Sequence, residues 1–479
     1  MKILRFLIKT ILIILIITIS IIFFRAFNSL NQADLKPWNT LKPEPELLLN
    51  NSYSSFEDFV KADREYIRRN FNKIDVSKLG DFNKYNPKGM SYSLGNGNNY
   101  NASFILDPGK DNTKGIIVLT HGLSDSPYHV YNLGQYFLNK GYYVFGLRMP
   151  GHGTLPSGLL NVTWQDWYKA VKWSMKTATE LAKSRNNVPV SMGGFSTGGS
   201  LSIHYCLMAA EDDNLKMPEK VFLFSPAAGV SELGIVGAWH KSLSWLNYFK
   251  KFAWLDILPE YDPAKYMSFT KNAGRQVFLL CEENKALAEK IKEKNIASKL
   301  PSFISFESWV DATVKVGDLI KLYSKIGDSN DLLVIFDVNH KYEPFMRRSI
   351  VNNGPQNINT EANNSFNIHV ITNKTDSLRS NHISEVGVFP LHNGAYGKEV
   401  FPDSIATKWP NNYYAISHIC VPISPNNKLY GEKSFLNKLQ IHGERQVLVV
   451  TSEDINRIRY NPFFGLMKKE LDTFIDKTN

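Results

Sequence analysis

The chain has 479 residues, of which 43% are hydrophobic and 13% aromatic. This composition can bury a large core and excludes wholesale disorder, so we expect one large domain with appendages. The net charge of +10 is modest for the length, and no basic stripe is interleaved with aromatics, which disfavours nucleic-acid binding. Three cysteines without C-x-x-C spacing indicate neither a disulfide framework nor a zinc site, and we expect them to be buried.

The N-terminus has the pattern of a membrane anchor. Three positive charges (Lys2, Arg5 and Lys9) precede an apolar run at residues 11–24, and counting back to Phe6 gives a length sufficient to cross a bilayer. Small residues typical of a cleavage site do not follow the run. We therefore expect an uncleaved signal anchor at residues 1–27, one transmembrane helix with the rest of the chain on the extracytoplasmic, periplasmic side. A cleaved signal peptide is the alternative.

Residues 28–80 are predicted to form a linker and then an amphipathic helix. The polar stretch to about residue 52 contains Lys-Pro and Pro-Glu-Pro, which is typical of an extended linker. Apolar residues then recur at helical spacing: Phe56, Phe59, Val60, Tyr66, Ile67 and Phe71. We expect this face to pack on the core rather than on a membrane surface.

From residue 81 onward, predicted strands and helices alternate. A buried strand at residues 115–120 ends in His121 and Gly122, and a backbone that turns off a strand end can point an N–H group at a developing oxyanion. We expect His121 to be structural rather than a proton carrier. A helix, a strand at residues 142–149 and a PGHGT turn follow.

Ser196 lies at the apex of a predicted strand-turn-helix unit. The run Gly194, Phe195, Ser196, Thr197 and Gly198 follows a β-prone stretch and opens an apolar helical segment. A sharp turn of this kind holds the serine backbone in a strained conformation, which requires residues with almost no side chain two before and two after it. This context favours a nucleophilic serine over an ordinary glycine-rich turn.

The chain then forms a strand at residues 220–230 and leaves the predicted sheet for about seventy residues. This detour is rich in large aromatic residues: Trp239, Trp245, Tyr248, Phe249, Phe252 and Trp254. We expect them to form an apolar pocket, although ordinary packing of a subdomain explains them too. The charged run that begins at Cys281 has a helical pattern and is interpreted as a solvated helix face.

Asp311 follows the predicted strand at residues 302–308. A nucleophilic serine needs a histidine to take its proton, and that histidine needs a buried carboxylate to orient it. Asp311 lies directly past the strand end, whereas Asp318 and Asp331 fall away from it. The alternative role for Asp311 is to cap the next helix.

Several strings in the sequence resemble one protein family. They include LTHGLSDSPY, LRMPGHGT, GGFSTGGSL, LPEYDPAKYMSF, VDATV, SHICVPISPNNKLYG and RYNPFF. They resemble bacterial membrane-anchored α/β-hydrolases of the monoglyceride lipase and carboxylesterase branch, which are described as lysophospholipase-like or serine-aminopeptidase-like.

The resemblance implies an α/β-hydrolase fold, a mostly parallel doubly wound sheet, over residues 81–479. It also implies a helical lid at about residues 229–300 and a C-terminal extension at about residues 341–479. Ser196 is then the nucleophile and Asp311 the acid. The N–H groups of Leu123 and Thr197 form the oxyanion hole.

The catalytic histidine has two main candidates. Spacing selects His340, which follows the strand after Asp311 by an ordinary distance. The family string selects His418, far later in the chain, and an additional strand near residue 367 could return the chain to the catalytic edge. We favour His418 because a long string is more specific than a generic spacing. His382 and His392 are third choices.

These residues predict a serine hydrolase that cleaves carboxylic esters with an apolar acyl part, such as monoacylglycerols or lysophospholipids. The mechanism needs no metal or cofactor. A serine aminopeptidase is the enzymatic alternative, and a non-catalytic envelope protein on the same fold is the other.

Overall fold

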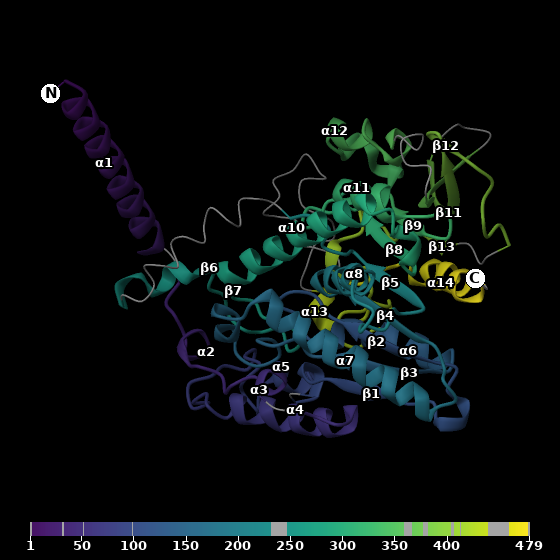
Figure 1. The fold of residues 1–479 in the computed structure, drawn as a ribbon, viewed down its shortest axis with the longest axis horizontal. Helices are drawn as coiled ribbons and strands as arrows, with labels where there is room; N and C mark the ends of the chain where they lie inside the picture. Colours follow the sequence, from purple (N-terminus) through teal and green to yellow (C-terminus); the bar gives the residue numbers. More distant parts are fainter. Residues whose placement is uncertain are drawn as a thin grey trace.

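The computed structural model describes residues 2–30, 33–50, 52–97, 99–230, 247–358, 366–376, 382–403, 407–411, 413–438 and 459–477. Its centre is an 11-stranded sheet in the order β1-β3-β2-β4-β5-β8-β9-β10-β11-β12, with β13 paired to β11 (Figure 1). All neighbours from β3 to β10 are parallel, while β1 and β11 to β13 pair antiparallel. The predicted mostly parallel sheet is therefore confirmed.

The strands have the following bounds: β1 Phe104–Leu106, β2 Gly115–Thr120, β3 Tyr142–Leu147, β4 Val190–Phe195, β5 Lys220–Phe224, β8 Ser302–Ser308, β9 Leu332–Phe336, β10 Asn367–Thr375, β11 His382–His392, β12 Ala395–Tyr396 and β13 Thr407–Lys408. The strands β2 to β5 and β9 are buried throughout, as is typical of parallel strands that are covered on both faces.

Helices cover both faces of this sheet. One layer contains α7 (Trp164–Ser184), α8 (Thr197–Ala209), α10 (Lys271–Glu293) and α11 (Val316–Ile326), and the other contains α6 (Tyr131–Asn139) and α14 (Phe464–Asp476). Successive residues of β2 point to opposite faces, so Ile116 packs in the first layer and Ile117 in the second. The sheet is doubly wound, and each face has its own apolar core.

The N-terminal helix α1 (Lys2–Leu30) projects from the body of the molecule (Figure 1). Its large apolar side chains are exposed, among them Ile11, Leu15 and Phe24. We expected a transmembrane helix at residues 1–27; within the described part of the chain, no helix is both long and apolar enough to span a membrane.

The linker prediction was wrong for residues 36–50. The segment contains α2 (Pro37–Thr40) and α3 (Leu47–Asn50), and Trp38 and Leu47 are buried in the core. Glu46 forms an ion pair of 3.0 Å with Arg148, which lies just past β3. Tertiary packing and this ion pair hold a segment that its polar composition marked as extended.

The amphipathic helix was predicted correctly and is α4 (Phe56–Phe71). Ser55 caps it by accepting a hydrogen bond from the N–H of Asp58. All six apolar residues predicted for its inner face are buried, and the Phe56 ring stacks on Phe145 of β3 with centroids 3.9 Å apart. A short helix, α5 (Met90–Leu94), follows before the sheet begins.

The segment expected to form a lid, residues 229–300, is described in part. Trp239, Trp245 and the side chains of Tyr248 and Phe249 lie outside the described residues. Phe252 and Trp254 are buried, and β6 (Trp254–Asp256) pairs with β7 (Phe269–Thr270). The second half of the segment is α10, which packs on α8 and α11 as part of the helical layer and includes the charged helix predicted near Cys281.

The C-terminal extension adds strands to the same sheet. β10 runs parallel to β9 in the register that pairs Ile368 with Leu333, and β11 turns back antiparallel to it. The helices α12 (Arg348–Val351) and α13 (Phe435–Lys438) are single turns, and residues 439–458 lie outside the described part. The extra strand predicted near residue 367 is confirmed. All three cysteines are buried, as expected.

Candidate active site

The turn at Ser196 joins β4 to α8 in a strained backbone conformation. Ser196 has φ 53° and ψ −117°, a region that residues with a side chain rarely adopt. A side chain at Gly194 would lie 2.2 Å from the carbonyl carbon of Gly198, and one at Gly198 would lie 2.2 Å from the carbonyl oxygen of Thr120. Both glycines are therefore required by steric contact, and the geometry is that of a nucleophile elbow.

Ser196, His418 and Asp311 form one hydrogen-bonded chain. The Ser196 hydroxyl donates to His418 Nε2 over 3.0 Å, and His418 Nδ1 donates to Asp311 Oδ2 over 2.7 Å. His418 opens a short helix, His418–Cys420, and its side chain is buried against the ring of Phe195. Residues 222 positions apart in the chain thus meet at hydrogen-bond distance.

Asp311 is fixed by its own loop. Its Oδ1 accepts hydrogen bonds from the N–H groups of Thr313 and Val314, which leaves Oδ2 for His418. Burial opposes ionisation of this carboxyl, but attraction to His418 and these hydrogen bonds hold its pKa below the usual value. The carboxylate is thus available as an acceptor for the imidazole.

A second carboxyl, Glu307 of β8, is buried beside Asp311. Burial and the neighbouring negative charge of Asp311 raise the pKa of Glu307 well above its usual value. Its Oε1 accepts a hydrogen bond from the N–H of Ser308. Burial and mutual repulsion therefore favour the protonated form of Glu307, while the partners of Asp311 favour its ionised form. Glu307 was not among the residues that we singled out from the sequence.

The loop after β2 approaches the elbow from the other side. Thr197 is the first residue of α8, and the N–H of a first helical residue has no acceptor within its own helix. Leu123 follows Gly122, where a side chain would lie 2.5 Å from Asp125 Oδ2 and 3.1 Å from the Phe195 ring. This close approach requires glycine next to the predicted oxyanion donor.

His121 is structural, as the sequence predicted. Its Nδ1 donates to the carbonyl of Gly122 over 2.8 Å, and its Nε2 accepts from the N–H of Met149 over 3.1 Å. Burial, together with the nearby His152, lowers the pKa of His121 well below its usual value. The neutral ring therefore ties the loop after β2 to the turn after β3 rather than carrying protons.

Buried ion pairs fix the same loop and the segment that carries His418. Asp125 forms an ion pair with Lys265, and although burial opposes ionisation, the charges of His129 and Lys265 lower the pKa of Asp125 to about 2. Asp262 accepts from Tyr430 over 2.6 Å and pairs with Arg459 over 2.8 Å. These residues belong to the strings that carried the family resemblance, so the strings supply the scaffold around the site.

The alternative histidines lie elsewhere. His340 donates to Asp337 Oδ2 over 2.7 Å and to Glu343, and His382 lies next to it, with ring centroids 4.9 Å apart. Burial opposes protonation of His340, but the two carboxylates raise its pKa to about 9. His392 is exposed at the far end of β11.

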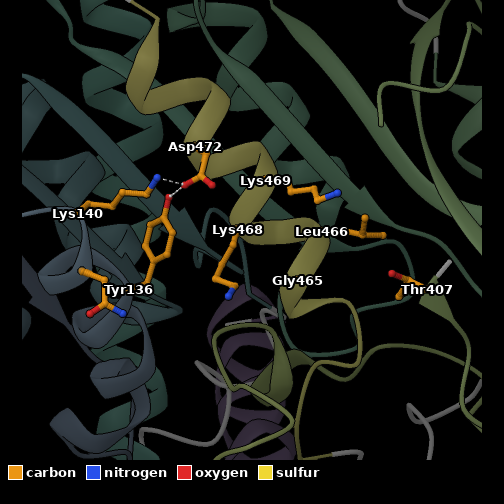
Figure 2. Close-up of a pocket in the computed structure, with 9 residues that line it drawn as sticks. Tyr136, Lys140, Thr407, Gly465, Leu466, Lys468, Lys469 and Asp472 are labelled. Atoms are coloured by element: carbon orange, nitrogen blue, oxygen red, sulfur yellow. Dashed lines mark hydrogen bonds and ion pairs between the residues drawn. The ribbon is translucent and has the colours of Figure 1, made fainter. Parts of the chain in front are cut away.

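A cavity of about 500 Å³ lies between α6 and α14, away from these residues (Figure 2). It is lined by Tyr136, Asn139, Lys140, Thr407, Gly465, Leu466, Lys468, Lys469 and Asp472. Asp472 binds both Tyr136 and Lys140. No residue of the Ser196 site lines it.

Residues 111–314 match the family model described as serine aminopeptidase, S33. The chain has the α/β-hydrolase fold. The matched segment contains the loop at His121, the elbow and Asp311, and it ends before β9 and the extension that carries His418. Together with the sheet order and the elbow, the match supports a serine hydrolase of the α/β-hydrolase superfamily. No curated protein matches the sequence.

Solved structures with a similar course of the chain include lipases. A soluble variant of monoglyceride lipase from Saccharomyces cerevisiae is 13% identical over 49% of this chain and 81% of that chain, with a TM-score of 0.38. A monoacylglycerol lipase from Paleococcus ferrophilus is 17% identical over 49% of this chain and 87% of that chain, with a TM-score of 0.35. The order of the strands and the turn at Ser196 define the fold of the chain.

Proposed function

We propose that the chain hydrolyses carboxylic esters with an apolar acyl part through an acyl-enzyme. The observation that carries the proposal is the hydrogen-bonded chain from Ser196 through His418 to Asp311. In the proposed mechanism, Ser196 Oγ attacks the acyl carbonyl while His418 Nε2 takes its proton. His418 then gives this proton to the leaving alcohol, and a water molecule, activated by the same ring, releases the acid.

Asp311 and two backbone N–H groups complete the proposed machinery. Asp311 holds His418 in the tautomer that presents the Nε2 lone pair to serine, and it stabilises the imidazolium that forms. The N–H groups of Leu123 and Thr197 would donate to the oxyanion of the tetrahedral intermediate. Gly122 and Gly198 leave no room for a side chain, so the loop after β2 and the turn at Ser196 can approach each other closely. This close approach supports the assignment.

Monoacylglycerols and lysophospholipids are the substrate classes that we propose. The aromatic-rich segment between β5 and α10 supports an apolar acyl pocket, since aromatic side chains exclude water from an acyl-enzyme.

We also propose, from the charged N-terminus and the apolar run at residues 11–24, that the chain is held in a cell membrane with the catalytic part on the extracytoplasmic side. Recovery of the chain in the soluble fraction after alkaline carbonate washing would contradict that placement.

Covalent labelling tests the proposed reaction. A fluorophosphonate should label the wild type at Ser196, and Ser196→Ala should lose both the label and hydrolysis of p-nitrophenyl acyl esters, because the nucleophile is gone. Ser324→Ala, which changes an exposed serine of α11, is the control and should keep both. A folded wild type that takes no label would favour a non-catalytic protein on this fold.

A serine aminopeptidase is the second candidate, and the family description of residues 111–314 favours it. Such an enzyme needs a pocket for the free amine of a peptide, which is usually acidic. Cleavage of amino-acid anilides with a free amine, without hydrolysis of p-nitrophenyl acyl esters, would select this candidate over the esterase.

A further inference from the structure

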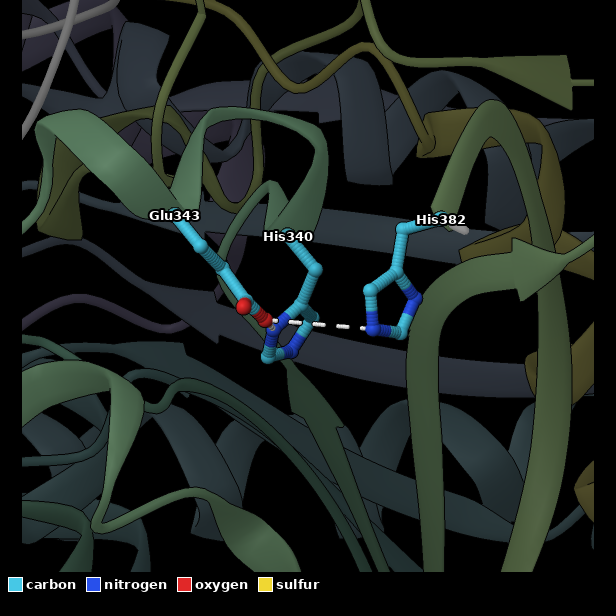
Figure 3. A group of neighbouring side chains, drawn as sticks. All are labelled: His340, Glu343 and His382. Atoms are coloured by element: carbon cyan, nitrogen blue, oxygen red, sulfur yellow. Dashed lines mark hydrogen bonds and ion pairs between the residues drawn. The ribbon is translucent and has the colours of Figure 1, made fainter. Parts of the chain in front are cut away.

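Three side chains outside the Ser196 site converge at the edge of the sheet (Figure 3). His340 and Glu343 lie in the short helix His340–Phe345 after β9, and His382 is the first residue of β11. Each side chain offers one potential metal-binding atom, and these atoms all lie within 4.8 Å of one another. Two imidazoles and one carboxylate are the donor set of many three-ligand sites for Zn²⁺.

A buried carboxylate orients the first of these ligands. Asp337 Oδ2 accepts from His340 Nε2 over 2.7 Å and from Thr372 Oγ1 over 2.9 Å, and Asp337 Oδ1 accepts from the N–H of Val338. His340 Nδ1 is thereby directed at Glu343, on the side where His382 lies. Histidine ligands of metals commonly have their outer nitrogen held by a carboxylate in this way.

We propose that His340, Glu343 and His382 bind one Zn²⁺ ion, with water in the fourth position. Ligand atoms of a tetrahedral zinc site lie about 3.3 Å apart, given zinc to ligand distances of about 2.0 to 2.1 Å. His382 Nε2 lies 3.8 Å from Glu343 Oε1, so small side-chain movements close the site. The carboxylates of Asp337 and Glu343 balance the two charges of the ion.

The exposure of the three residues gives the ion a path of entry. The His340 side chain is 9% exposed, whereas those of Glu343 and His382 are 33% and 38% exposed. The inner ligand is therefore fixed before binding, and the outer two can adjust from the solvent side. On binding, the proton that His340 Nδ1 donates to Glu343 leaves to solvent and the metal takes its place.

An ion bound here would join the start of β11 to the helix after β9. The neighbouring Asn339 donates to the carbonyl oxygens of Tyr413 and Tyr414, over 2.8 and 2.9 Å, just before the segment that carries His418. Zinc bound here would strengthen the junction of β9, β11 and this segment. The proposal does not rest on the proposed ester hydrolysis, because binding can be measured without a substrate.

The test uses the full chain, purified without a histidine tag and treated with a chelator. Titration with Co²⁺ should give the visible absorption of a tetrahedral site at one equivalent, and Zn²⁺ should displace it. His382→Gln and Glu343→Gln should each weaken Zn²⁺ binding by at least about tenfold. His392→Gln removes an exposed histidine from the other end of β11 and should bind like the wild type.

Two outcomes overturn the proposal. One is a wild type that binds no Co²⁺ or Zn²⁺ at micromolar concentration, and the other is a His382→Gln variant that binds as tightly as the wild type. His382 is exposed at a strand end, so circular dichroism should show this variant folded. Loss of binding in a folded His382→Gln variant, with binding kept in His392→Gln, supports the site.

Discussion

His340 and His418 are both held by buried carboxylates, but their second partners differ. His418 donates to Asp311 and accepts from the Ser196 hydroxyl, whereas His340 donates from both ring nitrogens, to Asp337 and Glu343. A ring between two carboxylates is stabilised as a cation and has no lone pair that could take a proton. Both histidines have a carboxylate on one ring nitrogen. The group on the other ring nitrogen, rather than the position of the residue after a strand, therefore distinguishes a candidate base from a charged or metal-binding histidine.

The largest expected effect tests the His418 side of this comparison. His418→Ala and Ser196→Ala should each lower kcat/KM for a p-nitrophenyl ester by roughly 10⁴-fold or more, and the double variant should lose no more than either single one. His392→Ala is the control and should keep the wild-type rate. Losses that multiply in the double variant would show that the two residues do not act as a unit.

Asp311→Asn should give the next largest loss, about 10³ to 10⁴-fold in kcat. The side-chain amide of the variant can donate to His418 Nδ1, which favours the tautomer with the proton on Nε2. In that tautomer Nε2 cannot accept the proton of Ser196. Asp318→Asn, in the first turn of α11, is the matched control. A rate near that of the wild type for Asp311→Asn, measured with the same ester, would remove this carboxylate from the mechanism.

A pH-dependent effect on stability is expected from Glu307. Its pKa is raised in the folded protein, while in the unfolded chain glutamate ionises above about pH 4.3. The unfolded state therefore binds fewer protons above that pH, and the free energy of unfolding falls as pH rises, by at most about 1.4 kcal/mol per pH unit. Below about pH 4.3, Glu307 is protonated in both the folded and the unfolded state, and the folded protein has the full stabilisation that this carboxyl contributes.

Glu307→Gln keeps the shape of the side chain and removes this titration. Urea unfolding should show the variant gaining stability relative to the wild type between about pH 5 and pH 8. Glu219→Gln, at an exposed position before β5, should follow the wild type across the range. A constant difference between Glu307→Gln and the wild type would mean that Glu307 is already ionised in the folded protein.

The smallest effect concerns the scaffold that holds the His418 segment. Tyr430→Phe removes the hydrogen bond to Asp262 and should cost about 1 to 2 kcal/mol in the free energy of unfolding, because the buried carboxylate loses one of its donors. Thermal unfolding measures this cost. Tyr396→Phe, near the edge of the sheet, is the control and should change the melting temperature less.

Local patterns were enough to single out Ser196 and Asp311 and to predict the α4 helix, since strand ends, glycine spacing and helical periodicity are properties of short segments. His418 could be favoured only through a family string, because 107 residues and several strands separate it from Asp311. The packing of Trp38 and Leu47 escaped prediction for a similar reason: their partners come from distant parts of the chain. The cluster of His340, Glu343 and His382 has no sequence spacing typical of a metal site, apart from the three-residue step from His340 to Glu343.

The late position of His418 has a consequence for biosynthesis. Ser196 and Asp311 leave the ribosome first, and the ring that joins them follows 107 residues after Asp311. At about 5 to 20 residues per second, this delay lasts roughly 5 to 20 seconds. During that time a nascent chain holds the serine and the carboxylate without their imidazole. Under the proposed mechanism, hydrolysis begins only after His418 has been synthesised, and chains cut short before His418 stay inactive.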